Sequence, residues 1–446
     1  MAVVSFQQAR AVASGLDQPD AFARHESDIR SYCRKFPSVF VGASSATIID
    51  ESGREYIDFL SGAGALNYGH NPEPIKRAVI DYLSEDGILQ ALDLYTAAKR
   101  DFISAFYETV LQPRGLDCKL AFPGPTGTNA VELALKFARH ATDRESVVAF
   151  TNAYHGVSLG SLALTGNRRK RASAGIGLPG VVRLPYDGYL GEGVDTAALF
   201  ERLLDDEGSG IDMPAAVILE TVQAEGGLNA CSARWLQRIC ETARRHGVVT
   251  IIDDIQIGCG RTGTFFSFEG SGIEPDIVCL SKSLSGIGQP FSLVLLKPEL
   301  DCLSPGAHNG TFRGNNLAFV SARAALRYWS DPLFQQRLED LCSVLRNRFD
   351  AIAGEFAQLQ TRVVGRGAIL GLTWPSAAMA QRVSAAAFRR GLIIETCGAR
   401  NQVLKALPSL TIRDEELNSG LERLRGAIAD VTRIARRPNR QGGQHE

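Results

Sequence analysis

The chain has 446 residues, of which 45% are hydrophobic, and its formal net charge is −1 at pH 7. That length is enough for a large core and for two structural domains. The nearly balanced charge argues against a broad attraction to nucleic acid or to an anionic membrane. One basic run, at residues 168–171, lies among Gly, Asn and Ser residues. We interpret it as a solvated loop, with a targeting or nucleic-acid patch as the alternative.

Nine cysteines are scattered along the chain without a Cys-x-x-Cys pair. This pattern favours reduced thiols over a disulfide framework or a zinc site, so we expect no bound metal. The first residues lack the basic and then apolar segment of a secretory signal, and no run is long enough to span a bilayer. We therefore expect a soluble, cytoplasmic protein with neither a membrane nor a nucleic-acid partner.

The N-terminal part of the chain has short strand signals. Residues 1–30 are polar and weakly patterned, and we expect a helix or an arm there. Residues 47–50 and 55–59 flank a Glu-Ser-Gly turn signal and predict two strands. The Gly-Ala-Gly of residues 62–64 is not a dinucleotide fingerprint, because Asn67 and Gly69 replace the helix that should follow.

Helices and apolar strands then alternate, as a doubly wound α/β sheet requires. The patterns predict helices at residues 72–83, about 130–140 and 232–246, and a long helical stretch from about residue 317. They predict strands at residues 146–150, 215–219, 248–252, 276–280, 291–296, 367–373 and 391–395. The last residues, 436–446, are polar and predicted to be disordered.

Two of these strands lead to reactive side chains. The apolar run at residues 248–252 stops at Asp253, and the run at residues 276–280 leads to Lys282. Unbroken apolar runs suit strands that are covered on both faces, and an open α/β sheet binds its ligand beyond the carboxyl ends of its strands. An aspartate near a lysine often forms only a surface ion pair, so the residues between them decide the interpretation.

Those intervening residues resemble the signature of the class III aminotransferases. Three motifs match: Asp-acidic-aliphatic-Gln from Asp253, Gly-x-Gly-Arg-Thr-Gly at residues 258–263, and Ser-Lys-Ser around Lys282. The resemblance implies the α/β fold of the fold-type I transferases that depend on pyridoxal 5′-phosphate (PLP). That fold has a large domain with a mostly parallel seven-stranded sheet, and a small α/β domain built from both termini.

The resemblance also divides the chain. We expect residues 1–75 to form an N-terminal arm and part of the small domain, and residues 76–330 to form the large PLP-binding domain. Residues 331–435 would form the C-terminal small domain, and residues 436–446 a disordered tail.

The roles of the reactive residues follow from the resemblance and from amine chemistry. A lysine ammonium has a pKa of about 10.4 in water, and burial lowers this value and frees a nucleophilic amine. The resemblance implies that Lys282 holds the PLP aldehyde and later moves a proton. Asp253 would keep the ring nitrogen protonated so that the ring accepts electrons. Ile255 would press on one face of the ring, and Gln256 would donate toward its phenolic oxygen.

A phosphate site is expected at the start of the helix that follows residues 122–126. Unpaired N–H groups and a partial positive charge at a helix N-terminus suit a phosphate. Glu132 lies three residues past Asn129, as in a capping box. An ordinary capped helix without a ligand is the alternative. The resemblance implies that Gly127 and Thr128 are phosphate donors.

The resemblance completes the cofactor site with aromatic, acidic and hydroxyl residues. Tyr154 would stack on the ring, with a core tyrosine as the alternative, and His155 would support the site. Glu220 and Glu225 lie in a segment similar to Glu-Pro-x-Gln-Gly-Glu-Gly-Gly, and beside a cofactor we favour a functional role over solvated carboxylates. Thr311 would cross a dimer interface to the partner's phosphate, which makes a homodimer a requirement and leaves a tetramer open.

The expected substrate contacts are less defined. Lys405 lies where most class III enzymes carry an arginine that clasps the α-carboxylate of glutamate and pairs with the residue matching Glu225. Lys405 would do this as a point charge; the alternative is a lysine that snorkels to solvent. By position, Tyr32 and Asn67 are candidate substrate contacts, with packing or turn roles as the equal alternative.

The wider match, from about residue 36 to residue 411, resembles the subgroup of diaminobutyrate–2-oxoglutarate transaminases of ectoine and siderophore pathways. It implies a ping-pong transfer of an amino group between L-glutamate and aspartate 4-semialdehyde, giving L-2,4-diaminobutyrate and 2-oxoglutarate. Ala224, Gln289 and Cys397 depart from the subgroup's pattern. The alternatives are another class III ω-aminotransferase acting on ornithine, 4-aminobutyrate or a larger amine, a PLP racemase or aminomutase, and a regulator without catalysis.

Overall fold

The computed structural model of the chain describes residues 18–436. The chain divides into two compact units, Met1–Val39 and Phe40–Glu446. The first unit holds helices α2 (Gln18–His25) and α3 (Tyr32–Lys35). The start of the expected N-terminal arm and the expected disordered tail past residue 436 lie outside the described residues. Within residues 18–436, no helix is long and apolar enough to cross a bilayer.

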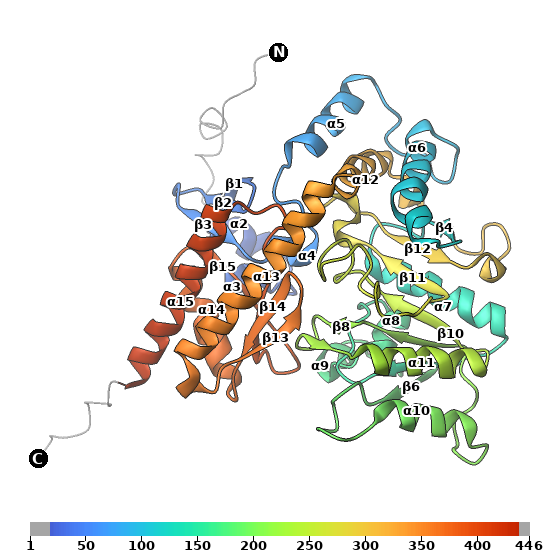
Figure 1. Cartoon of the computed structure of the whole chain (residues 1–446). Helices are drawn as coiled ribbons and strands as arrows, with labels where there is room; N and C mark the ends of the chain where they lie inside the picture. The colour runs from blue at the N-terminus through green and yellow to red at the C-terminus, as the bar shows by residue number, and fades with distance from the viewer. Residues whose placement is uncertain (1–17, 437–446) are drawn as a thin grey trace, which may run out of the picture. The chain divides into compact units, whose positions relative to one another are not determined.

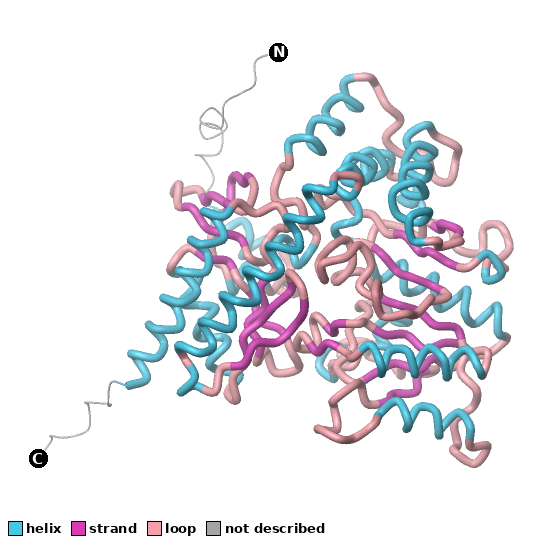
Figure 2. Tube along the Cα trace, viewed as in Figure 1, coloured by secondary structure: helices cyan, strands magenta, loops and turns pink. Residues whose placement is uncertain are grey.

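A seven-stranded sheet is the scaffold of the second unit (Figures 1 and 2). Its strands lie in the order β4-β12-β11-β10-β7-β5-β6. Strand β12 is antiparallel to its neighbours β11 and β4, and the other neighbouring pairs are parallel. The expected mostly parallel sheet is therefore confirmed. The strands are β4 (Lys119–Ala121), β5 (Val147–Phe150), β6 (Val181–Leu184), β7 (Ala216–Leu219), β10 (Val249–Asp253), β11 (Ile277–Leu280) and β12 (Leu293–Leu296).

Successive residues of these strands pack into two different cores. In β10, Ile252 belongs to the core that contains Trp235 of helix α11 (Ala233–Arg245). Its neighbour Ile251 belongs to the core that contains Val131 of helix α7 (Gly127–Thr142). Because side chains alternate across a strand, this arrangement buries both faces of the sheet and explains the unbroken apolar runs.

Helices and short turns connect the strands. The helices of this part are α4 (Ser61–Gly64), α5 (Glu73–Ser84), α6 (Ala97–Phe106), α8 (Leu159–Leu164), α9 (Arg168–Ala172) and α10 (Thr196–Asp205). The 3₁₀ and π turns are η1 (Tyr107–Leu111), η2 (Gln112–Arg114), η3 (Lys282–Ser285), η4 (Pro298–Leu300), η5 (Thr311–Gly314) and η6 (Ala357–Leu359). The long helical stretch expected from residue 317 is two helices, α12 (Asn316–Trp329) and α13 (Pro332–Glu355). The break falls at Asp331, which caps α13 directly before its proline.

A smaller lobe combines both ends of the second unit, as expected for this fold class. Strand β15 (Leu392–Ile393) pairs in parallel with β3 (Glu55–Asp58), and extends the sheet β1-β2-β3-β15. A second sheet has the order β13-β14-β17-β16. The single strand predicted at residues 391–395 is thus split between two sheets.

The remaining elements of this lobe are β1 (Phe40–Ser44), β2 (Thr47–Asp50), β13 (Arg362–Arg366), β14 (Ile369–Thr373), β16 (Glu395–Cys397), β17 (Val403–Ala406), α14 (Ala377–Arg389) and α15 (Asp414–Arg436). A separate two-stranded ribbon consists of β8 (Val222–Gln223) and β9 (Asn229–Ala230). The domain boundaries expected at residues 75, 330 and 435 stay predictions.

A buried arginine joins the glycine-rich loop after β10 to the smaller lobe. Arg261 is 0% exposed and donates to the carbonyl oxygens of Ala368 (3.2 Å) and Pro408 (2.5 Å), and to the side chain of Asn67. The close approach needs a glycine at residue 367, whose φ is +65° and where a Cβ would lie 2.5 Å from the backbone of Thr262. Burial lowers the pKa of Arg261 to about 9.

Replacing this arginine should destabilise the fold. Arg261→Met leaves three buried acceptors without a donor, and each such acceptor costs about 1–3 kcal/mol. We expect the free energy of unfolding, measured by urea denaturation, to fall by at least about 3 kcal/mol. The exposed Arg327 on α12 provides the control, since Arg327→Met should change stability by less than about 0.5 kcal/mol. A loss below 1 kcal/mol for Arg261→Met would contradict this account of the loop.

Candidate active site

The carboxyl ends of the parallel strands meet at one cavity. Strands β5, β7, β10 and β11 run in the same direction, so the residues that follow them lie along one edge of the sheet. The cavity has a volume of about 280 Å³. It is lined by Thr126, Gly127, Thr128, Tyr154, His155, Gly156, Val157, Glu220, Glu225, Asp253, Ile255, Gln256, Ile257 and Lys282. All cofactor residues expected from the sequence line this cavity, except Thr311.

Lys282 follows β11 in an unusual backbone conformation. Its φ is +48°, in the left-handed region that costs a non-glycine residue about 1–2 kcal/mol. Such strain is typical of residues that the surrounding structure holds for a function. Burial, reinforced by the charge of Lys405, lowers the pKa of Lys282 to about 8, although Glu225 and Asp253 act in the opposite direction. The amine is thus much closer to its nucleophilic form at neutral pH than a surface lysine.

Asp253 is oriented from two sides. One carboxylate oxygen lies 2.7 Å from Nδ1 of His155, and the other accepts the N–H of Ile255 at 3.1 Å. Both side chains are buried. Burial alone would lower the pKa of His155, but the hydrogen bond and the charge of Asp253 outweigh it and raise the pKa. The pair therefore holds a carboxylate in place at the end of β10.

Glu220 sits under the aromatic residue of the cavity. Its carboxylate accepts the N–H groups of Tyr154 (2.9 Å) and Ala224 (3.3 Å). Burial first, and then the charge of Asp253, raise the pKa of Glu220 to about 8, against the opposing charge of His155. The solvated carboxylate considered for this position is ruled out, because Glu220 is buried and its hydrogen bonds position Tyr154.

Helix α7 begins at the cavity with small residues. It starts at Gly127, earlier than predicted, and its first N–H groups have no acceptor within the helix. A Cβ at residue 127 would lie 2.8 Å from Cγ2 of Ile255, so only glycine allows this contact between helix and strand end. The helix N-terminus thus meets the edge of the sheet where the cavity opens.

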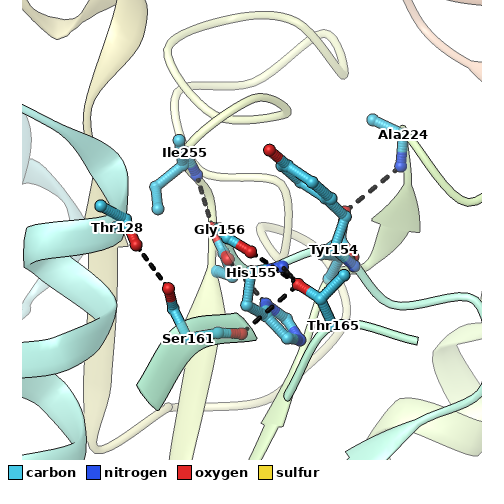
Figure 3. Close-up of polar contacts among 10 residues, drawn as sticks. Thr128, Tyr154, His155, Gly156, Ser161, Thr165, Ala224 and Ile255 are labelled. Carbon is cyan, nitrogen blue, oxygen red and sulfur yellow. Dashed lines mark hydrogen bonds and ion pairs between the residues drawn. The ribbon is translucent and has the colours of Figure 1, made fainter. Parts of the chain in front are cut away.

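The expected capping box at Glu132 is wrong. The side chain of Asn129 accepts the N–H of Thr126, so the box lies one turn earlier. Glu132 instead accepts the hydroxyl of Ser158 (2.6 Å) and the N–H of Ser161 (3.0 Å). The hydroxyl of Thr128 bonds to both of these serines, and Figure 3 shows its contact with Ser161. These hydrogen bonds hold the loop after β5 against helix α7. The sequence analysis did not predict them.

Lys405 occupies a buried acidic cluster. It lies on β17, is 0% exposed, and its Nζ is 2.6 Å from Glu225, 3.1 Å from Glu395 and 3.2 Å from the side-chain oxygen of Gln256. A snorkelling lysine keeps its ammonium in water, so that alternative is wrong. Burial would lower the pKa of Lys405, but Glu225 and Glu395 hold it well above its ordinary value.

The pKa of Glu225 is shifted by the two lysines of the site, Lys405 and Lys282. Burial would raise the pKa of its carboxyl, but the charges of Lys405 and Lys282 and the hydrogen bond from Lys405 lower it to about 2. Glu395 was missed by sequence reasoning, although it ends an apolar run and pairs in register with Lys405 across β16 and β17. A buried acid at the end of such a run was the available signal.

Among the expected contacts of the second unit, Lys405, Asn67 and Thr311 do not line the cavity. Asn67 is 1% exposed, its amide donates to the carbonyl of Cys259 at 2.8 Å, and its oxygen accepts from Arg261. These contacts match the packing role that was the open alternative for Asn67. Thr311 lies in the turn η5 and is exposed. Tyr32 is exposed and belongs to the N-terminal unit, and its expected substrate contact stays a prediction.

Removing the cation of the acidic cluster should be costly. Lys405→Met leaves Glu225 and Glu395 without their positive partner, and breaking a buried ion pair in this way costs about 3–5 kcal/mol. We expect a loss of that size in the free energy of unfolding, measured in urea at pH 7. Lys76→Met is a matched control, because Lys76 makes a 2.6 Å ion pair with Glu73 on the exposed face of α5. That pair should contribute about 0–1 kcal/mol, and equal losses in both variants would contradict the burial argument.

Comparisons with known proteins identify the family of this chain. A sequence model of the family described as Aminotransferase class-III matches residues 32–428. A diaminobutyrate–2-oxoglutarate transaminase of Halalkalibacterium halodurans is 51% identical over 402 residues, which cover 90% of this chain and 94% of that protein. A protein of the same name from Halomonas elongata is 51% identical over 409 residues, covering 91% and 97%.

A solved structure shares the fold. The ornithine aminotransferase of Toxoplasma gondii, crystallised with partial occupancy of PLP at its active site, superposes with a TM-score of 0.82. It is 25% identical and covers 97% of this chain, which covers 99% of it. Because the family match spans most of the sequence and the relatives are about half identical, this chain belongs to the class III aminotransferases and is a PLP-dependent transaminase.

Proposed function

We propose that this enzyme transfers an amino group between L-glutamate and aspartate 4-semialdehyde, giving L-2,4-diaminobutyrate and 2-oxoglutarate by a ping-pong route. The observation that carries the proposal is the 51% identity, over 90% of the chain, to a protein named for this reaction. The likeness to ornithine aminotransferase is weaker in sequence, at 25% identity, and supports ornithine only as the alternative substrate. The departures at Ala224, Gln289 and Cys397 leave room for a different acceptor.

The residues of the cavity fit PLP. The N-terminus of α7 offers N–H donors to a phosphate, and Gly127 leaves the space that a Cβ would close. Asp253 offers a fixed carboxylate to a protonated ring nitrogen, and Lys282 offers an amine with a lowered pKa to an aldehyde. When bound, PLP supplies an electron sink that stabilises the carbanion formed at the substrate's reacting carbon.

The roles of this chain's residues follow from that fit. Lys282 would hold the cofactor through its amine and would move the proton at the substrate's reacting carbon. Asp253, oriented by His155, would keep the ring nitrogen protonated. Tyr154 and Ile255, which both line the cavity, would contact the ring.

The side chain of Gln256 can bind the cofactor in addition to making hydrogen bonds within the protein. Its amide nitrogen donates to the carbonyl of Ala63 at 2.8 Å, and the same nitrogen carries a second N–H. We assign that second N–H to the phenolic oxygen of the cofactor. The side-chain oxygen of Gln256 meanwhile accepts from Lys405 and ties the ring contact to the acidic cluster.

The assembly proposed for this enzyme is a homodimer in the cytoplasm. Thr311 is exposed and does not line the cavity of its own chain, which supports the expectation that it serves the phosphate site of a second copy. A tetramer of two dimers stays open.

Cofactor capture should depend on the ionisation of Lys282. Because only the neutral amine attacks an aldehyde, the rate at which cofactor-free protein takes up PLP should rise with pH and level off above about pH 8, the pKa of Lys282. The visible absorbance band that develops on mixing measures this rate. Lys282→Ala should not develop the band. A rate that still rises steeply at pH 10, as an ordinary lysine would give, would contradict the lowered pKa.

The substrate proposal is tested by donor competition. Purified enzyme mixed with L-2,4-diaminobutyrate and 2-oxoglutarate should form glutamate, measured with a coupled glutamate assay. Ornithine and 4-aminobutyrate at the same concentration should give at least about tenfold lower kcat/KM, since a misplaced reacting amine loses about 1.4 kcal/mol or more. Faster turnover of ornithine would replace the proposed substrate while leaving the transaminase assignment intact.

A further inference from the structure

The buried lysine of the acidic cluster lies between two carboxylates of the protein. Its ammonium donates to Glu225 at 2.6 Å and to the side-chain oxygen of Gln256 at 3.2 Å, and lies 3.1 Å from Glu395. A substrate carboxylate at this point would lie beside the carboxylates of Glu225 and Glu395, and like charges at close range repel one another. Residue 405 is therefore poorly suited to bind a carboxylate in this chain.

The proposed substrates nevertheless need such a contact. Glutamate and 2-oxoglutarate carry a carboxylate at the end remote from the reacting carbon, and diaminobutyrate carries its only carboxylate away from the reacting amine. The cavity also contains the carboxylates of Glu225 and Asp253, so an outer carboxylate needs a cation at the rim.

Lys170 is a cation next to the rim. Its Nζ lies 4.6 Å from the centre of the Tyr154 ring, and Tyr154 lines the cavity. Among residues 18–436, no carboxylate lies within ion-pair distance of this ammonium. The charge of Lys170 also contributes to the lowered pKa of Glu225, which agrees with a position near the cavity mouth.

The short helix that carries Lys170 is fixed to the loop of Tyr154. The side chain of Asn167 accepts the N–H of Lys170 at 3.1 Å, and Arg171 donates to the carbonyl of Thr165 at 3.0 Å. Directly before the helix, the N–H of Gly166 donates to the carbonyl of Ala153 at 2.7 Å. The flexible side chain of Lys170 thus starts from a fixed backbone and can leave the aromatic ring for an anion.

We propose that Lys170 binds the outer carboxylate of glutamate, 2-oxoglutarate and diaminobutyrate. This contact is distinct from the α-carboxylate contact that the resemblance implies for residue 405. The inference rests on the proposed function for the identity of these substrates. It gives a function to the basic run at residues 168–171. The sequence alone predicted a solvated loop there, and that prediction is wrong because these residues form helix α9. It also assigns Lys405 to the positioning of Glu225 and Gln256.

The test uses the PLP-loaded enzyme and two readouts. The first is the KM and kcat for 2-oxoglutarate. The second is the Kd of glutarate, an unreactive dicarboxylate, measured by calorimetry. A hydrogen bond between charged groups corresponds to about tenfold or more in binding, so Lys170→Gln should raise both KM and Kd about tenfold and change kcat less than twofold. Lys170→Arg should retain most of the binding.

Two controls separate a contact from a general charge effect. Arg169→Gln removes an exposed charge from the same helix and should leave both constants unchanged. The amine 1,3-diaminopropane is diaminobutyrate without its carboxylate, and its turnover should not respond to Lys170→Gln.

Several outcomes would overturn the proposal. They are unchanged glutarate binding in Lys170→Gln, an equal effect of Arg169→Gln, or an equal loss with 1,3-diaminopropane. A wild-type enzyme that binds glutarate through Lys170 but forms no glutamate would instead reject the proposed function.

Discussion

The coverage of the seven-stranded sheet on both faces is the constraint on which the rest of this structure depends. Because alternate residues of β10 and β11 enter two separate apolar cores, these strands are almost entirely apolar, and the one hydroxyl in β10, that of Thr250, is hydrogen-bonded to Asp276. Charged side chains are therefore confined to the strand ends and the residues after them. Asp253 and Lys282 lie at two such ends, and both line the same cavity. The fold thus creates the site by leaving one edge of the sheet free for charged groups.

The charges at that edge are arranged so that each has a counterpart. Asp253 is held by His155, and Glu225 and Glu395 enclose Lys405. This pairing leaves Lys282 as the amine of the cavity with a lowered pKa. Desolvation acts on all of these groups, and the ion pairs decide in which direction each pKa finally moves. The site is therefore better described as one coupled set of charges than as a series of independent residues.

Much of this arrangement could be predicted from the sequence, because apolar runs that stop at a charged residue locate strand ends. The central strands and the gathering of Asp253 and Lys282 in one cavity follow from that pattern. The rest depended on contacts between residues far apart in the chain. Glu132 proved to bind serines after β5, Asn67 to bind the buried Arg261, and Glu395 to belong to the cluster of Lys405. No local pattern distinguishes these roles, since the same side chains suit caps, turns and solvated surfaces.

The most direct test of the central claim is a crystal structure of the protein grown with PLP. The account predicts continuous electron density between Lys282 Nζ and the cofactor, a carboxylate oxygen of Asp253 within hydrogen-bond distance of the ring nitrogen, and the phosphate at the N-terminus of α7. A cofactor attached to another lysine, or bound with its ring nitrogen away from Asp253, would contradict the account.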